Sequence, residues 1–344
     1  AALRECAAEW GMSAAGWAQG AECAPAETIT CDENGMVTQL HLNSKELTGS
    51  IPLALTALSH LQLLDLQSNS LSGPVAPALS ALRLHTLRLS DNNLTGPVFT
   101  IIASMQSLID LELYSNSFTG PVPCTVSRLH RLSHLQMSFN DFHGPLPQPF
   151  THLTALATLS MAKTGLSGPL LGDITALSAL QSLQCVCVCH TSLVSYAHAC
   201  IACVIDTISD ATGNNISGSI PSTITALSRL VYLSLGQNPL LSGSLPRALS
   251  RLTTLKELTL DGTNISGELP RFLTALTRLD SFNVLDTKIN GTMPATYGSL
   301  KLSSFGFAGL TCPMDYTSCE INQNRSSKFC TFCSSFCSTC IPIN

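Results

Sequence analysis

The sequence predicts an α/β repeat solenoid, with a parallel sheet along one face and short helical turns along the other. Two observations lead to this fold class. A leucine-centred pattern recurs about every 24 residues through most of the chain, and cysteines gather near the two ends, where a stack of coils must be capped. Because each coil packs only on its neighbours, all 344 residues can belong to one array.

The repeat follows the pattern Leu-x-x-Leu-x-Leu-x-x-Asn-x-Leu-x-Gly-x-Ile-Pro, which is well preserved in the unit that begins at Leu108. Its units begin at Val37, Leu61, Leu84, Leu108, Leu132, Leu156, Leu180, Leu230, Leu255 and Leu279, with a partial unit at Leu302. A single unit cannot bury its own leucines, whereas a stack of such units can.

A short strand opens each unit. Leu111 and Leu113 alternate with Glu112, and this period of two is typical of a strand with one buried face. We expect the leucines to point into the core and the residues between them to line the concave surface. Since the pattern repeats in every unit, these strands should align as one parallel sheet.

A turn follows each strand and carries an asparagine whose side chain can bond backbone groups of the next coil. The asparagines predicted to stack into this ladder are Asn69, Asn92, Asn116, Asn140, Asn214 and Asn238. Three units have Thr164, Thr263 or Thr287 instead, and the first has Lys45. A hydroxyl group replaces only part of the amide, so a looser turn is expected there.

A Gly-x-hydrophobic-Pro step then reverses the chain, as in Gly49-Ser50-Ile51-Pro52 and Gly120-Pro121-Val122-Pro123. Glycine allows a positive φ at the bend, and proline fixes φ at the start of the following segment. The return segment, for example Leu55-Thr56-Ala57-Leu58, should form a short helical turn on the convex side. The predicted fold is therefore a leucine-rich-repeat horseshoe, with an array over residues 37–311.

Residues 1–36 are predicted to form the first cap. Leu3 to Trp17 has the pattern of a short amphipathic helix that carries two tryptophans. Cys23 and Cys31 flank a short loop and are predicted to pair, which leaves Cys6 spare. The chain opens directly into this cap, as expected of a mature chain whose signal peptide has been removed or of one produced without it.

Residues 312–344 are predicted to form the second cap and a cysteine-rich tail. We expect Cys312 to pair with Cys319. The tail carries Cys330-x-x-Cys333 and Cys337-x-x-Cys340, and only three residues separate the two pairs. Common zinc ribbons have a much longer loop between their pairs, so disulfides or a disordered tail are favoured over zinc.

An insertion of roughly residues 187–212 interrupts the unit that begins at Leu180. It is rich in cysteine and lacks repeat character. A membrane span is rejected, because repeats continue in register on both sides. Three interpretations stay open: a disulfide-stapled loop, a retained intron, or a metal-binding knot. The knot would use Cys187, Cys189, His190, His198, Cys200 and Cys203.

Composition excludes several partners. Charged residues make up only 11% of the chain and the net charge is −5, so there is no basic footprint for nucleic acid or anionic lipid. Fifteen cysteines, clustered at the ends, favour an oxidising compartment, and we expect a secreted or cell-surface protein. N-glycosylation is predicted at the sequon asparagines Asn93, Asn215, Asn264, Asn290 and Asn324.

Catalytic motifs are not found. The sequence holds no GxSxG elbow, HExxH pair, P-loop or GxGxxG loop. Its His, Ser and Asp residues fall at variable surface positions of the repeats. We therefore predict a binding protein without enzymatic activity, cofactor or metal.

The unit Leu108-x-x-Leu111-x-Leu113-x-x-Asn116-x-Phe118-Thr119-Gly120-Pro121-Val122-Pro123 resembles the plant-specific leucine-rich-repeat class, and Cys31-Asp32-x-x-Gly35-x-Val37 resembles its amino-terminal cap. The combination of such repeats with two small cysteine caps is similar to polygalacturonase-inhibiting proteins and to plant receptor-kinase ectodomains. This resemblance implies an extracellular recognition scaffold, either an inhibitor of a secreted cell-wall-degrading enzyme or a receptor-like ectodomain. The alternative is a structural or adhesive surface protein.

A partner would bind on the concave face, where charged and aromatic residues gather in the first half of the array. The partner is predicted to be a protein, with a peptide or a glycan as further forms of the ligand. The residues predicted to contact it are Asp65, Arg88, Asp91, Glu112, Tyr114, Gln136, Phe139 and Lys163. The alternative for this patch is that Arg88 and Glu112 simply pair across adjacent strands.

Overall fold

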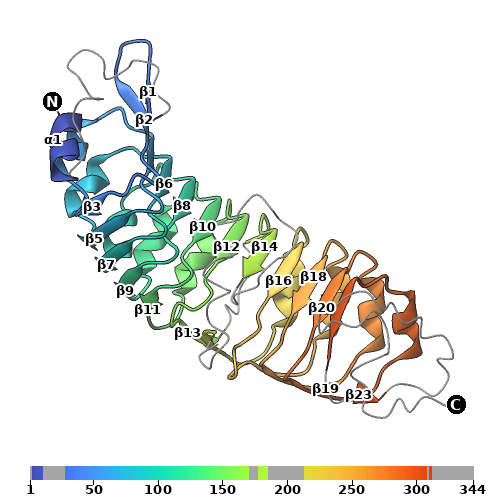
Figure 1. Ribbon diagram of the computed structural model, residues 1–344. Coiled ribbons are helices and arrows are strands. Elements are labelled where there is room, and N and C mark those ends of the chain that lie inside the picture. The colour runs from blue at the N-terminus through green and yellow to red at the C-terminus, as the bar shows by residue number, and fades with distance from the viewer. Residues whose placement is uncertain (1, 11–27, 170–176, 185–212, 308–309, 312–344) are drawn as a thin grey trace, which may run out of the picture. The chain divides into compact units, whose positions relative to one another are not determined.

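The computed structural model describes residues 2–10, 28–169, 177–184, 213–307 and 310–311. It divides into two compact units, Ala1–Gly165 and Leu166–Asn344. Each unit is a stack of coils with one strand of a larger sheet in each coil (Figure 1). We call this larger sheet the main sheet, and the side of it that faces away from the buried leucines the main-sheet face.

In the first unit the main sheet follows chain order, and neighbouring strands are parallel from β2 onward. Its strands are β1 (Ile29–Cys31), β2 (Val37–His41), β4 (Leu63–Asp65), β6 (Thr86–Arg88), β8 (Asp110–Glu112), β10 (His134–Gln136) and β12 (Thr158–Ser160). Every predicted unit start is followed within two residues by a strand, except at Val37, where the strand begins at once. The periodic leucines therefore predicted the strand positions correctly.

The second unit repeats the arrangement. Its main-sheet strands are β14 (Ser182–Gln184), β16 (Tyr232–Ser234), β18 (Glu257–Thr259), β20 (Ser281–Asn283) and β22 (Ser304–Gly306). Aromatic side chains replace leucine in the last coils, where Phe282 stacks on Phe305 with ring centroids 5.3 Å apart. The predicted insertion at 187–212 lies outside the described residues, as does the tail at 312–344.

A second set of short parallel strands, which the sequence analysis did not predict, runs beside the ladder of turns. We call these strands the lateral sheet. They are β3 (Thr48–Gly49), β5 (Ser70–Pro74), β7 (Asn93–Gly96), β9 (Ser117–Gly120) and β11 (Asp141–Phe142) in the first unit, and β13 (Ser167–Pro169), β15 (Asn215–Ser217), β17 (Ser242–Gly243), β19 (Asn264–Glu268), β21 (Lys288–Thr292) and β23 (Leu310–Thr311) in the second. They cover the Asn-x-Leu-x-Gly segment of the repeat, so that segment is also extended backbone.

The return segments form single helical turns, as the sequence predicted. In the described part of the chain they are 3-10 turns, except for the short α2 (Phe99–Ile102). The 3-10 turns are η2 (Leu53–Ala57), η3 (Pro77–Ala81), η4 (Cys124–Arg128), η5 (Gln148–His152), η7 (Ser222–Ala226), η8 (Arg247–Arg251), η9 (Arg271–Ala275) and η10 (Ala295–Ser299). Proline directly precedes most of them with φ near its fixed value, for example −68° at Pro52.

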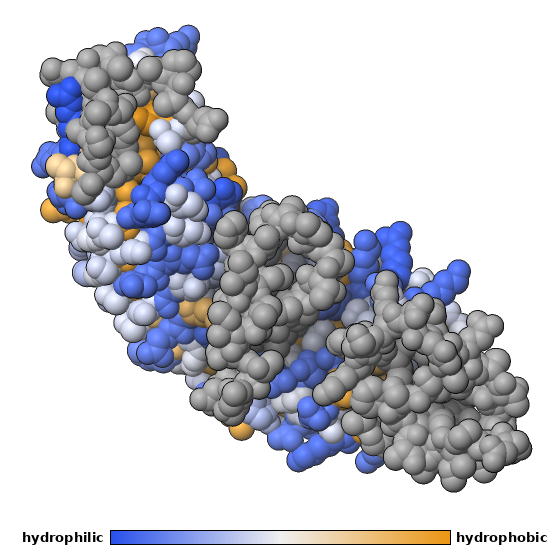
Figure 2. Space-filling view, viewed as in Figure 1, coloured by the Kyte–Doolittle hydropathy of each residue, from blue (hydrophilic) through white to orange (hydrophobic). Residues whose placement is uncertain are grey.

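The core of each unit is the stack of repeat leucines. Leu64, Leu87 and Leu111 occupy one column on adjacent strands and are 0% exposed. Large exposed hydrophobic side chains in the described chain are few and separate, namely Met36, Leu53 and Leu240. Figure 2 agrees, because hydrophilic residues cover most of the described surface in that view.

The predicted asparagine ladder is present in the first unit. The Oδ1 atom of Asn92 accepts a hydrogen bond from the backbone N–H of Leu71, one coil earlier, at 2.9 Å. Its Nδ2 group donates to the carbonyls of Leu66, Leu89 and Ser90 at 2.9–3.1 Å. Such bonds satisfy buried backbone groups where the chain leaves the sheet.

Threonine replaces only part of this network, as expected. Thr263 donates to the carbonyl of Leu260 at 2.7 Å, within its own coil. Thr287 donates to Val284 at 2.8 Å and accepts from the N–H of Ile289, again within its own coil. The shorter side chain of threonine therefore bonds its own turn where asparagine also reaches the preceding coil.

The amino-terminal cap contains helix α1 (Ala2–Glu9), which confirms the helix predicted to begin there, while Trp17 lies outside the described residues. Trp10 is buried, and its indole N–H donates to the carbonyl of Ser50 at 3.0 Å. Cys6 is a free, buried thiol, as predicted. An antiparallel pairing of β1 with β2 completes the described part of the cap.

Candidate functional site

The main-sheet face of the first unit brings the predicted central column together. Asp65, Arg88, Glu112 and Gln136 are direct register partners on four successive strands. Neighbouring strands lie about 4.8 Å apart, so each side chain can contact the next. The leucines between them are buried, which fixes these polar side chains on the opposite side of the sheet.

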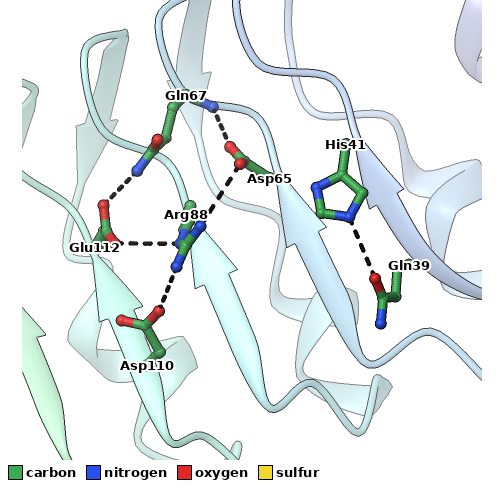
Figure 3. Close-up of polar contacts among 7 residues, drawn as sticks. All are labelled: Gln39, His41, Asp65, Gln67, Arg88, Asp110 and Glu112. Carbon is green, nitrogen blue, oxygen red and sulfur yellow. Dashed lines mark hydrogen bonds and ion pairs between the residues drawn. The ribbon is translucent and has the colours of Figure 1, made fainter. Parts of the chain in front are cut away.

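Arg88 lies at the centre of an ion-pair network (Figure 3). Its Nη2 group donates to Asp110 Oδ2 at 2.9 Å, its Nη1 lies 3.9 Å from Asp65 Oδ2, and its Nε lies 3.2 Å from Glu112 Oε1. The Nε contact is an ion pair by distance but lacks hydrogen-bond geometry, since Nε is a buried atom without a hydrogen-bond partner. The predicted pairing of Arg88 with Glu112 is thus present, with two further carboxylates around it.

Gln67, two residues after the end of β4, joins the network. Its backbone N–H donates to Asp65 Oδ1 at 3.1 Å, and its side-chain amide donates to Glu112 Oε2 on β8. That second bond passes over the intervening strand β6. We call Asp65, Gln67, Arg88, Asp110 and Glu112 together the Arg88 cluster.

Sequence reasoning missed Asp110 and Gln67. The prediction considered the residue between the two strand leucines and some of those after the second one. It passed over the position just before Leu111, although a period of two places Asp110 on the same face as Glu112. The signal was therefore available, and applying the alternation to both sides of Leu111 would have found it.

The cluster has an excess of negative charge, because three carboxylates surround one guanidinium. Burial raises the pKa of Asp65, which is 5% exposed, although the Gln67 N–H and Arg88 act in the opposite direction. Burial likewise raises the pKa of Glu112. Burial alone would lower the pKa of Arg88, but Asp110, Glu112 and Asp65 more than offset this and raise it.

Aromatic side chains border the cluster. The Tyr114 hydroxyl donates to Asp91 Oδ2 at 2.7 Å, and burial together with that carboxylate raises the pKa of Tyr114. Farther along the same edge, Lys163 Nζ lies 5.6 Å from the centre of the Phe139 ring. Such a distance is within the range of a cation–π contact.

Phe139 and Lys163 also occupy an unusual backbone position. The residue before the ladder asparagine has a positive φ in successive coils, and this residue is Ser68, Asp91 or Ser115 in other coils of the first unit. Phe139 and Lys163 adopt the same conformation, with φ of 55° and 48°. Bulky side chains are uncommon at positive φ, so the backbone is strained at both residues.

The main-sheet face of the second unit differs. The central column of that face consists of four uncharged residues, namely Gln184, Ser234, Thr259 and Asn283. Thr259 and Glu257 are buried, and the Thr259 hydroxyl donates to Glu257 Oε1 at 3.2 Å. Between β16 and β20, the central column of the second unit thus carries no charged residue, unlike that of the first unit.

The sequon asparagines lie on the lateral strands. Asn93, Asn215 and Asn290 are exposed there, whereas Asn264 is half-buried and donates to the carbonyl of Pro239 at 2.6 Å. Asn324 lies outside the described residues. Glycosylation of these positions stays a prediction, and the four described ones lie on the lateral sheet, away from the main sheet.

The predicted disulfides fall mostly outside the described residues. Cys31 is disulfide-bonded, but Cys23 lies outside the described chain, so their pairing stays a prediction. Cys312 and Cys319 also lie outside it. Cys124 is a free, exposed thiol on η4.

Within the described ranges, no group of three His, Cys, Asp or Glu side chains is placed to hold a metal ion. The same ranges contain no helix with the length and apolar character needed to cross a membrane. These findings concern the described residues alone and leave the interpretations of the 187–212 insertion open.

Comparison with known families identifies the repeat. A model described as Leucine Rich Repeat matches residues 60–82 and 83–105, which are the coils of β4 and β6. A crystal structure of the Arabidopsis receptor kinase HAESA, in complex with the peptide hormone IDA and the co-receptor SERK1, matches with a TM-score of 0.75 and 24% identity, over 90% of this chain and 49% of that one. The chain therefore has the leucine-rich-repeat fold of this plant receptor ectodomain.

Two further structures resemble this leucine-rich-repeat protein. The PEPR1–AtPEP1 crystal structure matches with a TM-score of 0.67 and 23% identity, over 90% of this chain and 48% of that one. A plant ice-binding protein matches with a TM-score of 0.69 and 24% identity, over 91% of this chain and 97% of that one. The leucine-rich-repeat protein therefore spans about half the length of the matched receptor chains and nearly the full length of the ice-binding protein. At these identities the likeness concerns the fold.

Proposed function

We propose that the protein is an extracellular recognition scaffold that binds a protein or peptide on the main-sheet face of its first unit. The observation that carries this proposal is the composition of that face. Charged and aromatic side chains, all partly exposed except Asp65, gather on adjacent strands between β4 and β12, held by a rigid sheet. Aromatic and arginine side chains are the usual anchors of protein interfaces.

The structural neighbours support the same class of ligand. The matched HAESA and PEPR1 structures are described as a complex with a peptide hormone and as PEPR1–AtPEP1. A parallel sheet with regularly spaced side chains suits an extended peptide, since each coil offers one set of contacts. An inhibitor of a secreted cell-wall-degrading enzyme would use the same face against a larger, folded partner.

The test is capture of partners from secreted and cell-wall proteins by the purified chain. Tyr114→Ala is the informative variant, because it removes an aromatic anchor and one hydrogen bond while the Arg88 ion pairs stay intact. Tyr232→Ala is the matched control, because Tyr232 is also a tyrosine of the main sheet but lies on β16, in the second unit. We expect Tyr114→Ala to lose capture by at least about tenfold, as for a central interface tyrosine. Equal capture by the two variants would refute a binding face on the first unit.

The rival class is a structural or adhesive surface protein. It predicts self-association of the pure chain, detectable by light scattering, and capture that tolerates Tyr114→Ala. Identification of a pectin-degrading enzyme among captured proteins, with loss of its activity on binding, would instead select the inhibitor form of the proposal.

Ice binding is the other function suggested by a neighbour, and the surface argues against it. Such a role requires a flat, repetitive array of similar small polar side chains. Charged residues interrupt the Ser and Thr residues of the lateral sheet: Asp141 in the first unit, and Glu268 and Lys288 in the second. We expect no thermal hysteresis in a solution of the purified chain.

A further inference from the structure

One buried polar atom without a hydrogen-bond partner belongs to the Arg88 cluster, and a second lies two residues after Arg88. Among the described residues, three buried side-chain atoms have no hydrogen-bond partner: Arg88 Nε, Ser90 Oγ and Ser234 Oγ. Two of the three therefore fall on one segment, at and just after strand β6. Buried polar groups are normally paired, so such a concentration calls for an explanation.

Ser90 is a buried residue next to this cluster in the chain. It is two residues after Arg88 with the buried Leu89 between them, so the period of two places its side chain on the same face as Arg88. It is 0% exposed. The bond from Gln67 to Glu112 joins the segment after β4 to β8 and so crosses the coil of β6, which contains Ser90.

The charges at this place are unbalanced as well. Asp65, Asp110 and Glu112 carry three negative charges against the single positive charge of Arg88. Their side chains are 7%, 19% and 17% exposed, which means that water screens them incompletely. A second cation at this position would therefore be attracted more strongly than at an ordinary surface carboxylate.

We infer that the Arg88 cluster binds a basic side chain, arginine or lysine, of an extended segment of the partner protein. This inference rests on the proposed function and adds the chemistry of the ligand. The incoming N–H groups donate to Glu112 and Asp110 and displace the amide of Gln67 from Glu112. The Ser90 hydroxyl, which has no hydrogen-bond partner, is a further acceptor beside them.

The surroundings suit such a side chain. Tyr114 follows Glu112 by two residues on the same face, and its ring is half-buried beside the cluster. An aromatic face next to carboxylates can pack against the aliphatic stem or the guanidinium of a bound basic residue. Asp91, which accepts the hydrogen bond of Tyr114 at 2.7 Å, holds that ring in place.

The experiment uses the full chain and three fluorescein-labelled peptides of equal length in a Gly/Ser background. The central pair of residues is arginine in the first peptide, glutamine in the second and glutamate in the third. Binding is measured by fluorescence anisotropy at low salt. We expect the arginine peptide to bind at least about tenfold more tightly than the glutamine peptide, because desolvated charge pairs contribute more than exposed ones.

Two variants test where the preference originates. Asp110→Asn/Glu112→Gln removes two charges at almost constant volume and should abolish the preference for arginine. Asp141→Asn/Glu268→Gln neutralises two exposed acids elsewhere and should leave the preference unchanged. Circular dichroism spectra matching the wild type would show that both variants fold.

Gln67→Ala should strengthen binding of the arginine peptide, whereas Asp110→Asn/Glu112→Gln should weaken it. The Gln67 variant frees Glu112 from its internal donor, so the arginine peptide should bind about two- to fivefold more tightly, as expected when one modest hydrogen bond no longer competes. A purely structural role for the network predicts no gain. Equal binding of the three peptides, or a preference that survives Asp110→Asn/Glu112→Gln, would overturn the inference. The proposed function would still stand if Tyr114→Ala abolished capture of partners.

Discussion

The asparagine ladder provides a sharp test of how the coils hold together, and Asn92→Ala is the perturbation. Asn92 is 7% exposed and makes four hydrogen bonds. Replacing it by alanine takes the acceptor from the Leu71 N–H. The carbonyls that it bonds lose one of two donors, since Leu66 and Leu89 also accept from Asn69 and Asn116.

The expected loss of stability follows from the contrast between the Leu71 N–H, which loses its acceptor, and the carbonyls, which keep a second donor. An orphaned buried donor costs about 1–3 kcal/mol, whereas each lost bond to a carbonyl that keeps another donor costs nearer 0.5 kcal/mol. The sum is roughly 3 kcal/mol, a large part of the stability of a domain. Asn92→Thr should cost about 0.5 kcal/mol less, because Thr263 shows that threonine still bonds the carbonyl three residues earlier.

The assay is urea unfolding followed by circular dichroism, on protein produced without glycans. Asn93→Ala is the matched control, since Asn93 is the next residue in the chain and is exposed. It should change the unfolding free energy by less than about 0.5 kcal/mol. If Asn92→Ala and Asn93→Ala had equal effects, the ladder would not stabilise the stack, and the account of its hydrogen bonds would be wrong.

Three further predictions concern other features of the first unit. In the native protein, iodoacetamide should modify Cys124, which is exposed, and not Cys6, because burial raises the pKa of Cys6 to about 12; mass spectrometry before and after unfolding checks this. Phe139→Asn should raise the free energy of unfolding by roughly 1 kcal/mol, because asparagine tolerates the positive φ better; an unchanged or lower urea midpoint would contradict this. Burial raises the pKa of Glu112, so the folded state holds its proton more tightly than the unfolded chain does. Stability should therefore fall as pH rises through the folded-state pKa, and Glu112→Gln should flatten that part of a urea-midpoint profile.

The regular spacing of the leucines was enough to predict most of the fold. Leucines at a fixed spacing have one simple explanation, which is burial against equivalent leucines of the next coil, and the strands lie where the pattern placed them. The lateral sheet was missed because its strands are two to five residues long and most of them contain glycine, a residue that ordinarily argues against a strand. Their pairing follows from the stacking of coils and has little to do with local propensity.

The sequence predicted the pairing of Arg88 with Glu112 in the candidate site but not the contributions of Asp110 and Gln67. The alternation around Leu111 placed Glu112 correctly, and the register that pairs it with Arg88 follows from the constant length of the coils. The bond from Gln67 to Glu112 could not be predicted, because it joins residues two coils apart and depends on side-chain rotamers. Burial of Ser90 likewise depends on what its neighbours cover.

Hydrogen–deuterium exchange of the chain, alone and with its captured partner, tests the central claim most directly. We predict that binding slows exchange in peptides that cover β6, β8 and β10 of the first unit's main sheet and leaves those of its lateral sheet unchanged. Protection confined to the lateral strands or to the 3-10 turns would contradict a recognition surface on the main-sheet face.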